Sequence, residues 1–84
     1  MVDRNPHSEM EVFVATVWSE VLKTDHIGLD DTFVDLGGDS LDALQVIAKI
    51  EKALGVRLKH EGHFVSTLEQ VAADLDAAVA ASAR

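Results

Sequence analysis

The chain has no cysteine, a single proline and few aromatic residues. Without cysteine it can form neither a disulfide framework nor a thiolate metal site. Basic residues are also scarce: 7 lysines and arginines stand against 15 aspartates and glutamates, which gives a formal charge of −8. This excess disfavours nucleic acid as a partner, because its phosphates would be repelled, and it favours basic protein surfaces. The alternative is an acidic surface that serves solubility alone.

The chain also lacks an apolar run of membrane-spanning length, and it does not open with a basic and then apolar leader. We therefore expect a cytoplasmic location and no membrane contact. Its 84 residues suffice for one small domain, residues 1–84, with an ordered core over about residues 8–80. A chain this short rarely encloses a deep substrate pocket, which disfavours an enzyme that works alone. We expect a monomer.

A first helix is predicted over about residues 9–22. Ser8 and Glu11 form an S-x-x-E capping box ahead of it. Apolar residues then recur at steps of three and four, as in an amphipathic helix. Trp18 lies on this apolar stripe, and we interpret it as a core residue rather than a ligand contact.

The following seventeen residues, 23–39, form a long connection that glycines and aspartates keep from being helical. A loop of this length fits a compact domain only if apolar side chains anchor it to the core. Phe33 and Leu36 are the best candidates for these anchors. Asp31 or Thr32 is predicted to start a short helical turn.

The second helix is predicted from Ser40 or Leu41 to about Leu54, with Gly55 as its stop. It carries two apolar stripes. The first is the predicted core face: Ala43, Val46, Ile47, Ile50 and Leu54. The second is interleaved with polar residues, and we interpret it as a docking surface: Leu41, Asp42, Leu44, Gln45 and Ala48. The alternative is that Leu44 lies at the core boundary and Leu41 is a lone exposed residue.

The final helix is predicted over about residues 67–80, after a capping box of Ser66 and Glu69. A short extra helix is expected near Glu61–Val65. Four apolar residues before the final helix are predicted to cap the core: Val56, Leu58, Phe64 and Val65. No alternating run of β-branched residues indicates a strand, so the predicted fold class is all-α.

The segment Gly37-Gly38-Asp39-Ser40 places one serine where a two-glycine turn meets the start of a helix. A helix N-terminus has unpaired N–H groups and a partial positive charge, which favour an attached phosphate. The structural alternative is a turn followed by an ordinary helix cap. A single cap, however, does not need two glycines together with both Asp39 and Ser40.

Independent catalysis and metal binding find little support. The G-x-S-x-G pattern of a hydrolase nucleophile fails, because Asp42 stands where the second glycine belongs. His60 and His63 have a plausible ligand spacing, but no further ligand lies near them. The acidic residues of the loop do not fit a calcium-binding loop, and we interpret them as solvated: Asp30, Asp31, Asp35, Asp39 and Asp42.

The stretch D-T-F-V-D-L-G-G-D-S-L-D-A-L, residues 31–44, resembles the modification-site signature of phosphopantetheine-dependent carrier proteins. The resemblance extends over nearly the whole chain, including the final S-T-L-E-Q-V-A segment. It implies a four-helix bundle of acyl-carrier type, with a long first loop and a short third helix. It also implies that Ser40 bears 4′-phosphopantetheine, transferred from coenzyme A by a phosphopantetheinyl transferase, with Gly38 and Asp39 beside it.

On this resemblance the protein is a carrier and not an enzyme. It holds aminoacyl, peptidyl or acyl groups as thioesters for an adenylating or acyl-loading enzyme and for later condensation or tailoring enzymes. The two glycines before Asp-Ser-Leu favour a peptidyl carrier of nonribosomal peptide synthesis, and the alternative is an acyl carrier of a fatty-acid or polyketide pathway. An unmodified helical interaction module, with Ser40 as a plain cap, is a third possibility.

One departure from the family pattern is Ser66 in the place of a proline before Thr67. It leaves the shape of the third-helix region open but does not affect Ser40. Because the chain starts at Met1 and ends soon after the final helix, we expect a free-standing carrier. The alternative is a domain excised from a larger synthetase, which would look similar.

Overall fold

The computed structural model describes residues 5–58 and 65–82. Within these ranges the chain forms three helices, α1 (Glu9–Leu22), α2 (Ser40–Leu54) and α3 (Leu68–Ser82). The same ranges hold no strand, only an isolated antiparallel bridge between Thr32 and Thr67. The predicted all-α class is confirmed. The short helix predicted near Glu61–Val65 lies outside the described residues, except for Val65.

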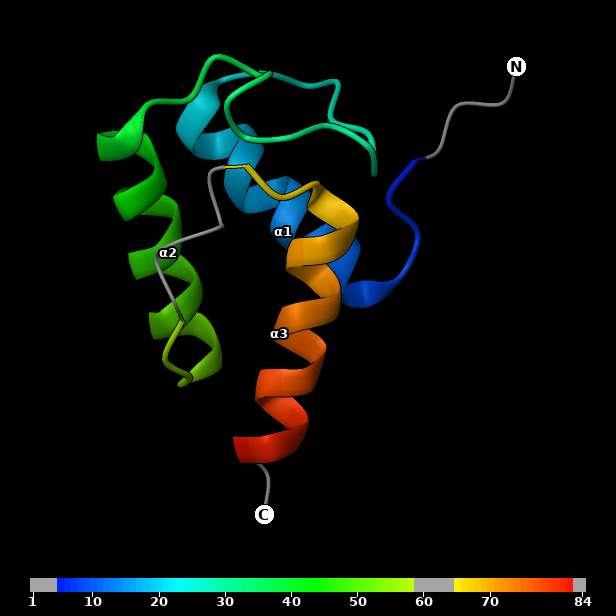
Figure 1. The fold of residues 1–84 in the computed structure, drawn as a ribbon, viewed down its shortest axis with the longest axis vertical. Helices are drawn as coiled ribbons and strands as arrows, with labels where there is room; N and C mark the ends of the chain where they lie inside the picture. Colours follow the sequence, from blue (N-terminus) through cyan, green and yellow to red (C-terminus); the bar gives the residue numbers. More distant parts are fainter. Residues whose placement is uncertain (1–4, 59–64, 83–84) are drawn as a thin grey trace.

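Helix α1 is the centre of the fold, because it packs against both α2 and α3. In Figure 1, α2 and the N-terminal segment lie on opposite sides of the molecule. The long first loop passes over one end of the molecule. Trp18 of α1 is fully buried, as predicted, and its ring meets the ring of Phe33 edge to face, with centroids 5.4 Å apart. Such an aromatic pair stabilises a fold by about 0.5–1.5 kcal/mol beyond its buried area.

Helix α2 turns its predicted core face inward. Ala43, Val46, Ile47 and Ile50 are buried and Leu54 is half-buried. The helix ends at Gly55, which has a left-handed φ of 68° and donates its N–H to the Glu51 carbonyl at 2.8 Å. The predicted glycine stop is confirmed.

The first loop is anchored more strongly than predicted. Phe33 is fully buried, as expected, and Leu36 is half-buried and packs against the core. Ile27 and Leu29 are buried as well. Two carbonyls of the loop also accept the first N–H groups of α3: Leu68 N–H donates to Asp31 O at 2.9 Å, and Glu69 N–H donates to Leu29 O at 3.1 Å.

The predicted capping box of α3 is wrong by one residue. Thr67, not Ser66, caps the helix: its hydroxyl accepts from the Gln70 N–H at 3.2 Å, and the Gln70 side chain accepts from the Thr67 N–H at 2.9 Å. The bridge to Thr32 and the two loop carbonyls fix the first turn of the helix one residue later. Tertiary contacts therefore decide between two overlapping capping patterns.

A second correction concerns Val65, which was expected to cap the core. Val65 is 67% exposed, because it lies in the turn before Thr67. Val56 is buried and Leu58 packs against the core, as predicted, while Phe64 lies outside the described residues. Across the parts that are described, no helix is long and apolar enough to cross a membrane.

Candidate functional site

A single helical turn precedes α2 and begins at Thr32, one of its two predicted starts. The Thr32 hydroxyl accepts from the Asp35 N–H at 3.1 Å, and the Thr32 carbonyl accepts from the Leu36 N–H at 3.2 Å. The turn is closed by two more bonds: Gly37 N–H to Val34 O and Gly38 N–H to Phe33 O, both 3.0 Å. This pair of bonds is the Schellman pattern that ends many helices.

The two glycines serve this turn in different ways. Gly37 has a φ of 90°, a left-handed conformation that side-chain-bearing residues rarely adopt. Gly38 has an ordinary φ, but a Cβ placed on it would overlap the Phe33 ring. Both glycines therefore have a structural explanation, Gly37 in its backbone conformation and Gly38 in the Phe33 ring, and their presence alone is no sign of function.

The position of the α2 start follows from these contacts. Phe33 packs on Trp18 in the core, and Gly38 lies directly against the Phe33 ring. Gly38 is buried and Asp39, the next residue, is exposed. The chain therefore leaves the core at Gly38 and reaches solvent at the first residues of α2.

Asp39 is the N-cap of α2. Its carboxylate accepts from the Asp42 N–H at 2.8 Å, and the Asp42 carboxylate accepts in return from the Asp39 N–H at 3.3 Å. The Asp39 carbonyl also accepts from the Ala43 N–H at 3.0 Å. Two of the four N–H groups in the first turn of α2 are thus occupied, and those of Ser40 and Leu41 have no partner in the described part of the chain.

Ser40 is the first residue of α2 and is exposed. Its hydroxyl makes no hydrogen bond to any described residue. The interpretation of Ser40 as a plain cap is therefore wrong, because Asp39 occupies that position. Once the turn, the cap and the two glycines are accounted for, the Ser40 hydroxyl is the group at this site without a structural role.

The second apolar stripe of α2 is exposed next to this serine. Leu41 is 64% and Leu44 is 49% exposed, and Gln45 and Ala48 are also exposed. The alternative of a half-buried Leu44 beside a lone exposed Leu41 is not what the structure shows. Docking on this stripe, and cofactor contacts by Gly38 and Asp39, remain predictions.

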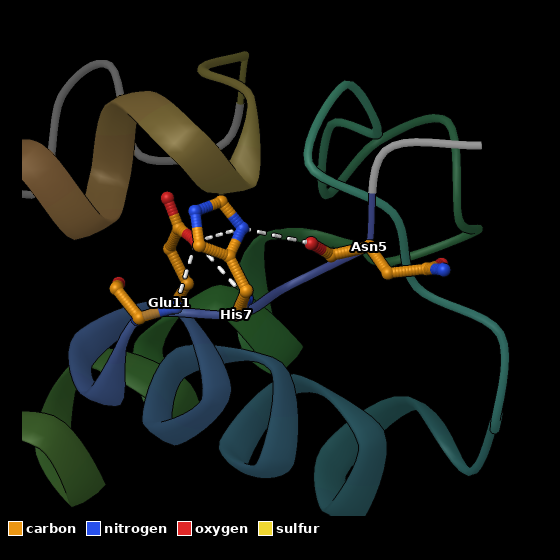
Figure 2. A network of polar contacts seen from close by, with 4 residues as sticks. Asn5, His7 and Glu11 are labelled. Carbon is orange, nitrogen blue, oxygen red and sulfur yellow. Dashed lines mark hydrogen bonds and ion pairs between the residues drawn. The ribbon is translucent and has the colours of Figure 1, made fainter. Parts of the chain in front are cut away.

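A different polar network lies at the start of α1 (Figure 2), where the sequence predicted the capping box but not the part of His7. The Glu11 carboxylate accepts from the backbone N–H groups of Ser8 and His7, both at 3.1 Å. These two bonds, and the His7 ring 3.3 Å away, lower the pKa of the Glu11 carboxyl. The His7 ring also lies 3.3 Å from the Asn5 carbonyl.

Neither of the two described histidines, His7 and His26, contacts Ser40. His7 contacts Glu11 and Asn5, and His26 is exposed in the first loop. His60 and His63 lie outside the described residues. In the ranges 5–58 and 65–82, no three histidine, aspartate or glutamate side chains are grouped so as to hold a metal ion.

Comparison with known families agrees with this geometry. Residues 12–75 match the family model described as "Phosphopantetheine attachment site". The chain belongs to this family. The match covers all of α2 and both sequence neighbours of Ser40. The cofactor that the resemblance implied, 4′-phosphopantetheine, is thereby confirmed at the level of the family.

The carrier domain is also similar to part of a curated protein, bacitracin synthase 1 of Bacillus licheniformis. The two are 34% identical over 73 residues, which is 86% of this chain but 1% of that protein. The chain thus spans a very small part of the length of this relative.

Two solved structures share the fold. One is described as McyG A-PCP complexed with phenylalanyl-adenylate. It has a TM-score of 0.80 and 36% sequence identity, and the match covers 87% of this chain and 12% of that chain. The other is a peptidyl carrier protein in a structure of the phosphopantetheine transferase Sfp with coenzyme A. It has a TM-score of 0.83 and 28% sequence identity, and the match covers 88% of this chain and 97% of that chain. These comparisons support the peptidyl carrier type. A carrier of this family is acted on by partner enzymes and is not itself a catalyst.

Proposed function

We propose that this carrier domain holds aminoacyl or peptidyl groups as thioesters on a 4′-phosphopantetheine arm attached to the Ser40 hydroxyl, within nonribosomal peptide synthesis. The observation that carries this proposal is the exposure, at the first position of α2, of a hydroxyl that has no hydrogen-bond partner among the described residues. The cysteine-free chain has no thiol of its own, and a phosphopantetheine arm would provide one.

The start of α2 fits a phosphate on Ser40. The N–H groups of Ser40 and Leu41 have no partner among the described residues and point toward the N-terminal end of the helix. The carboxylates of Asp39 and Asp42 repel the negative charge of a phosphate on Ser40. For this reason we assign these two carboxylates to the recognition of basic partner surfaces.

The attachment needs a separate transferase. The Ser40 oxygen forms a bond to the phosphorus that bears the pantetheine arm of coenzyme A. The bond from that phosphorus to the adenosine bisphosphate portion breaks, and that portion leaves. The hydroxyl proton passes to a base on the transferase, because no described histidine contacts Ser40.

We infer three groups of partners. The first is a phosphopantetheinyl transferase, since a similar peptidyl carrier occurs in a structure with one. The second is an adenylating enzyme, since a similar carrier occurs in an A-PCP structure. The third is the downstream condensation or tailoring enzymes. The exposed stripe of Leu41, Asp42, Leu44, Gln45 and Ala48 is the proposed docking surface for them.

We also propose the finer features of the fold. A short helix near Glu61–Val65 would complete a four-helix bundle, and residues 1–84 would form one carrier domain with a core over about 8–80. The high TM-scores to peptidyl carriers support this arrangement. A cytoplasmic location is proposed from the metabolic role.

Intact-protein mass spectrometry tests the attachment. Incubation with coenzyme A and a phosphopantetheinyl transferase should add one phosphopantetheinyl group to the wild-type chain and none to Ser40→Ala. Ser19→Ala, which removes a serine from α1, is the matched control and should be modified fully. An unmodified wild-type chain, or modification of Ser40→Ala, would contradict the proposal and favour the unmodified interaction module.

A substitution in the exposed stripe tests docking. Leu44→Asp should lower the rate of loading by an adenylating partner about tenfold or more, because a charge in an apolar interface centre is strongly unfavourable. Ala73→Asp, at an exposed position of α3, is the control and should load normally. Both variants should keep the helical circular dichroism spectrum. Equal loading by both would exclude the stripe as the docking surface.

A further inference from the structure

A groove with a volume of about 710 Å³ lies on the side of α1 that faces away from the core. Its walls come from the N-terminal segment around Pro6, from α1, and from the first part of the loop, residues 25–31. Neither α2 nor α3 contributes a lining residue. The groove is therefore separate from the phosphopantetheine site and its docking stripe.

The sequence of α1 explains why a face is left open there. The core stripe of α1 contains Val14, Val17 and Trp18, all buried. The groove stripe contains Val12, Thr16 and Ser19, and Ala15 lies at its edge, where it also packs against the core. Val12 precedes Val14 by two residues, and Ser19 follows Val17 by two residues. Because two residues turn a helix by about 200°, the groove stripe points away from the core stripe.

The centre of the groove is aliphatic. Val12 is 48% exposed, although it is a large apolar side chain within a helix. Ala15 and Ile27 line the groove beside it, and Ile27 is itself buried. Methyl groups at this point offer an apolar contact to an incoming side chain.

Around this centre, the charged side chains among the described lining residues are carboxylates, and one of them, Asp30, already takes part in another interaction. Four carboxylate residues line the groove: Glu20, Asp25, Asp30 and Asp31. Asp31 accepts a hydrogen bond from the Gly28 N–H at 2.8 Å, which holds its carboxylate in place. Among the described residues that line the groove, none is a lysine or arginine, and His26 is the only one that can become cationic. Lys23, the nearest lysine along the chain, is not among them.

We propose that this groove binds a lysine- or arginine-rich segment of a partner protein, with an aliphatic side chain of that segment on Val12 and its cations against Glu20, Asp25 and Asp31. Charge complementarity selects the occupant, since the three carboxylates of Glu20, Asp25 and Asp31, with no lysine or arginine among the described lining residues, repel anionic chains and attract cationic ones. The partner would hold the carrier by α1 and leave Ser40 on α2 accessible to enzymes. The groove thus serves as a holding surface, distinct from the surface on which the carrier is modified.

Fluorescence anisotropy with a labelled amphipathic lysine–leucine peptide tests this proposal. Glu20→Gln/Asp25→Asn should weaken binding about threefold to tenfold, as expected for two exposed ion pairs. Asp74→Asn/Asp76→Asn changes the net charge equally on exposed positions of α3 and should weaken binding less than about twofold. Val12→Ser should also weaken binding, without a change of charge. A glutamate–leucine peptide should not bind.

Nuclear magnetic resonance locates the peptide on the intact chain. Shifts should concentrate in residues 12–20 and 25–31, and the groove variant should still accept phosphopantetheine on Ser40 at the wild-type rate. Equal weakening by the two double variants would show that the peptide responds only to the net charge of the chain and not to the groove, and it would overturn the proposal. Shifts confined to α2 would also overturn it. Either failure would leave the assignment of Ser40 untouched, because that rests on the mass measurement.

Discussion

The helices α1 and α2 both start with a capping box, but the serine at each start has a different role. At α1, Ser8 is the N-cap: its hydroxyl accepts from the Glu11 N–H at 3.1 Å, and the Glu11 side chain completes the box. At α2, Asp39 is the N-cap and Asp42 completes the box, so that Ser40 stands one position further on. The hydroxyl of Ser8 is occupied by the backbone, whereas that of Ser40 faces solvent.

The difference teaches that a serine at a helix start is informative only when something else caps the helix. A serine that caps is held by its own hydrogen bond and is a poor acceptor of a modifying group. Where an aspartate is the N-cap, a serine that follows it lies at the exposed first position of the helix and does not cap the helix. At α2 this arrangement depends on the turn from Thr32 to Gly38, and α1 has no such turn in the described residues before it.

The largest effect should come from the glycine that sets this turn. Gly38→Val should lower the free energy of unfolding by about 1–3 kcal/mol, because its side chain would overlap the buried Phe33 ring. Gly37→Ala should cost about 1 kcal/mol, through its left-handed φ alone. Urea unfolding followed by circular dichroism measures both. If Gly38→Val were no more destabilising than Gly37→Ala, the start of α2 would not depend on Phe33.

The two serines give the next test. Ser8→Ala should lower the unfolding free energy by about 1 kcal/mol, because it removes a cap. Ser40→Ala should change it by less than about 0.5 kcal/mol, because the exposed first-turn hydroxyl that is lost has no partner in the described part of the chain. The modification assay should show the reverse pattern, with Ser8→Ala modified and Ser40→Ala not. Equal destabilisation by the two substitutions would remove the distinction between the two helix starts.

The smallest effect concerns the charge of the α1 box. The Glu11 carboxyl has its pKa lowered by the Ser8 and His7 N–H groups, so it binds protons more weakly in the folded chain than in the unfolded one. Its stabilising contribution is therefore complete above the ordinary glutamate pKa of 4.5 and is lost as the pH falls through the lower folded value.

Thermal melts at several pH values measure this contribution. Glu11→Gln should be less stable than wild type at about pH 7, and the gap should narrow on acidification below about pH 4. Glu9→Gln removes a charge from the same helical turn outside the box and serves as the control. A gap between wild type and Glu11→Gln that stayed constant down to low pH would show that the charge of Glu11 does not contribute.

Much of this architecture was predictable from the sequence. Local patterns sufficed for the three helices, the glycine stop at Gly55, the core position of Trp18 and the exposure of Leu41 and Leu44. Each of these rests on spacing or on a residue type with one dominant conformational preference. The family signature around Ser40 predicted the function in more detail than any pattern of charge or periodicity did.

The remaining features needed tertiary contacts. Ser66 and Thr67 both head a plausible capping box, and only the loop carbonyls and the bridge to Thr32 decide for Thr67. The two glycines before Ser40 were interpreted as a sign of function, whereas Gly38 is required by a ring five residues earlier in the chain. Contacts of this kind have no signal in local periodicity.

The hydrogen bonds from the start of α3 to the first loop also bear on the order of folding. Leu68 and Glu69 donate to carbonyls of Asp31 and Leu29, which precede the whole of α2 in the chain. A nascent chain that ends before α3 therefore lacks partners for these carbonyls and lacks the core residues Leu68 and Leu75. We therefore expect the loop that presents Ser40 to reach its final shape only when the last helix docks. Completion of the domain and readiness for modification are, on this account, the same event.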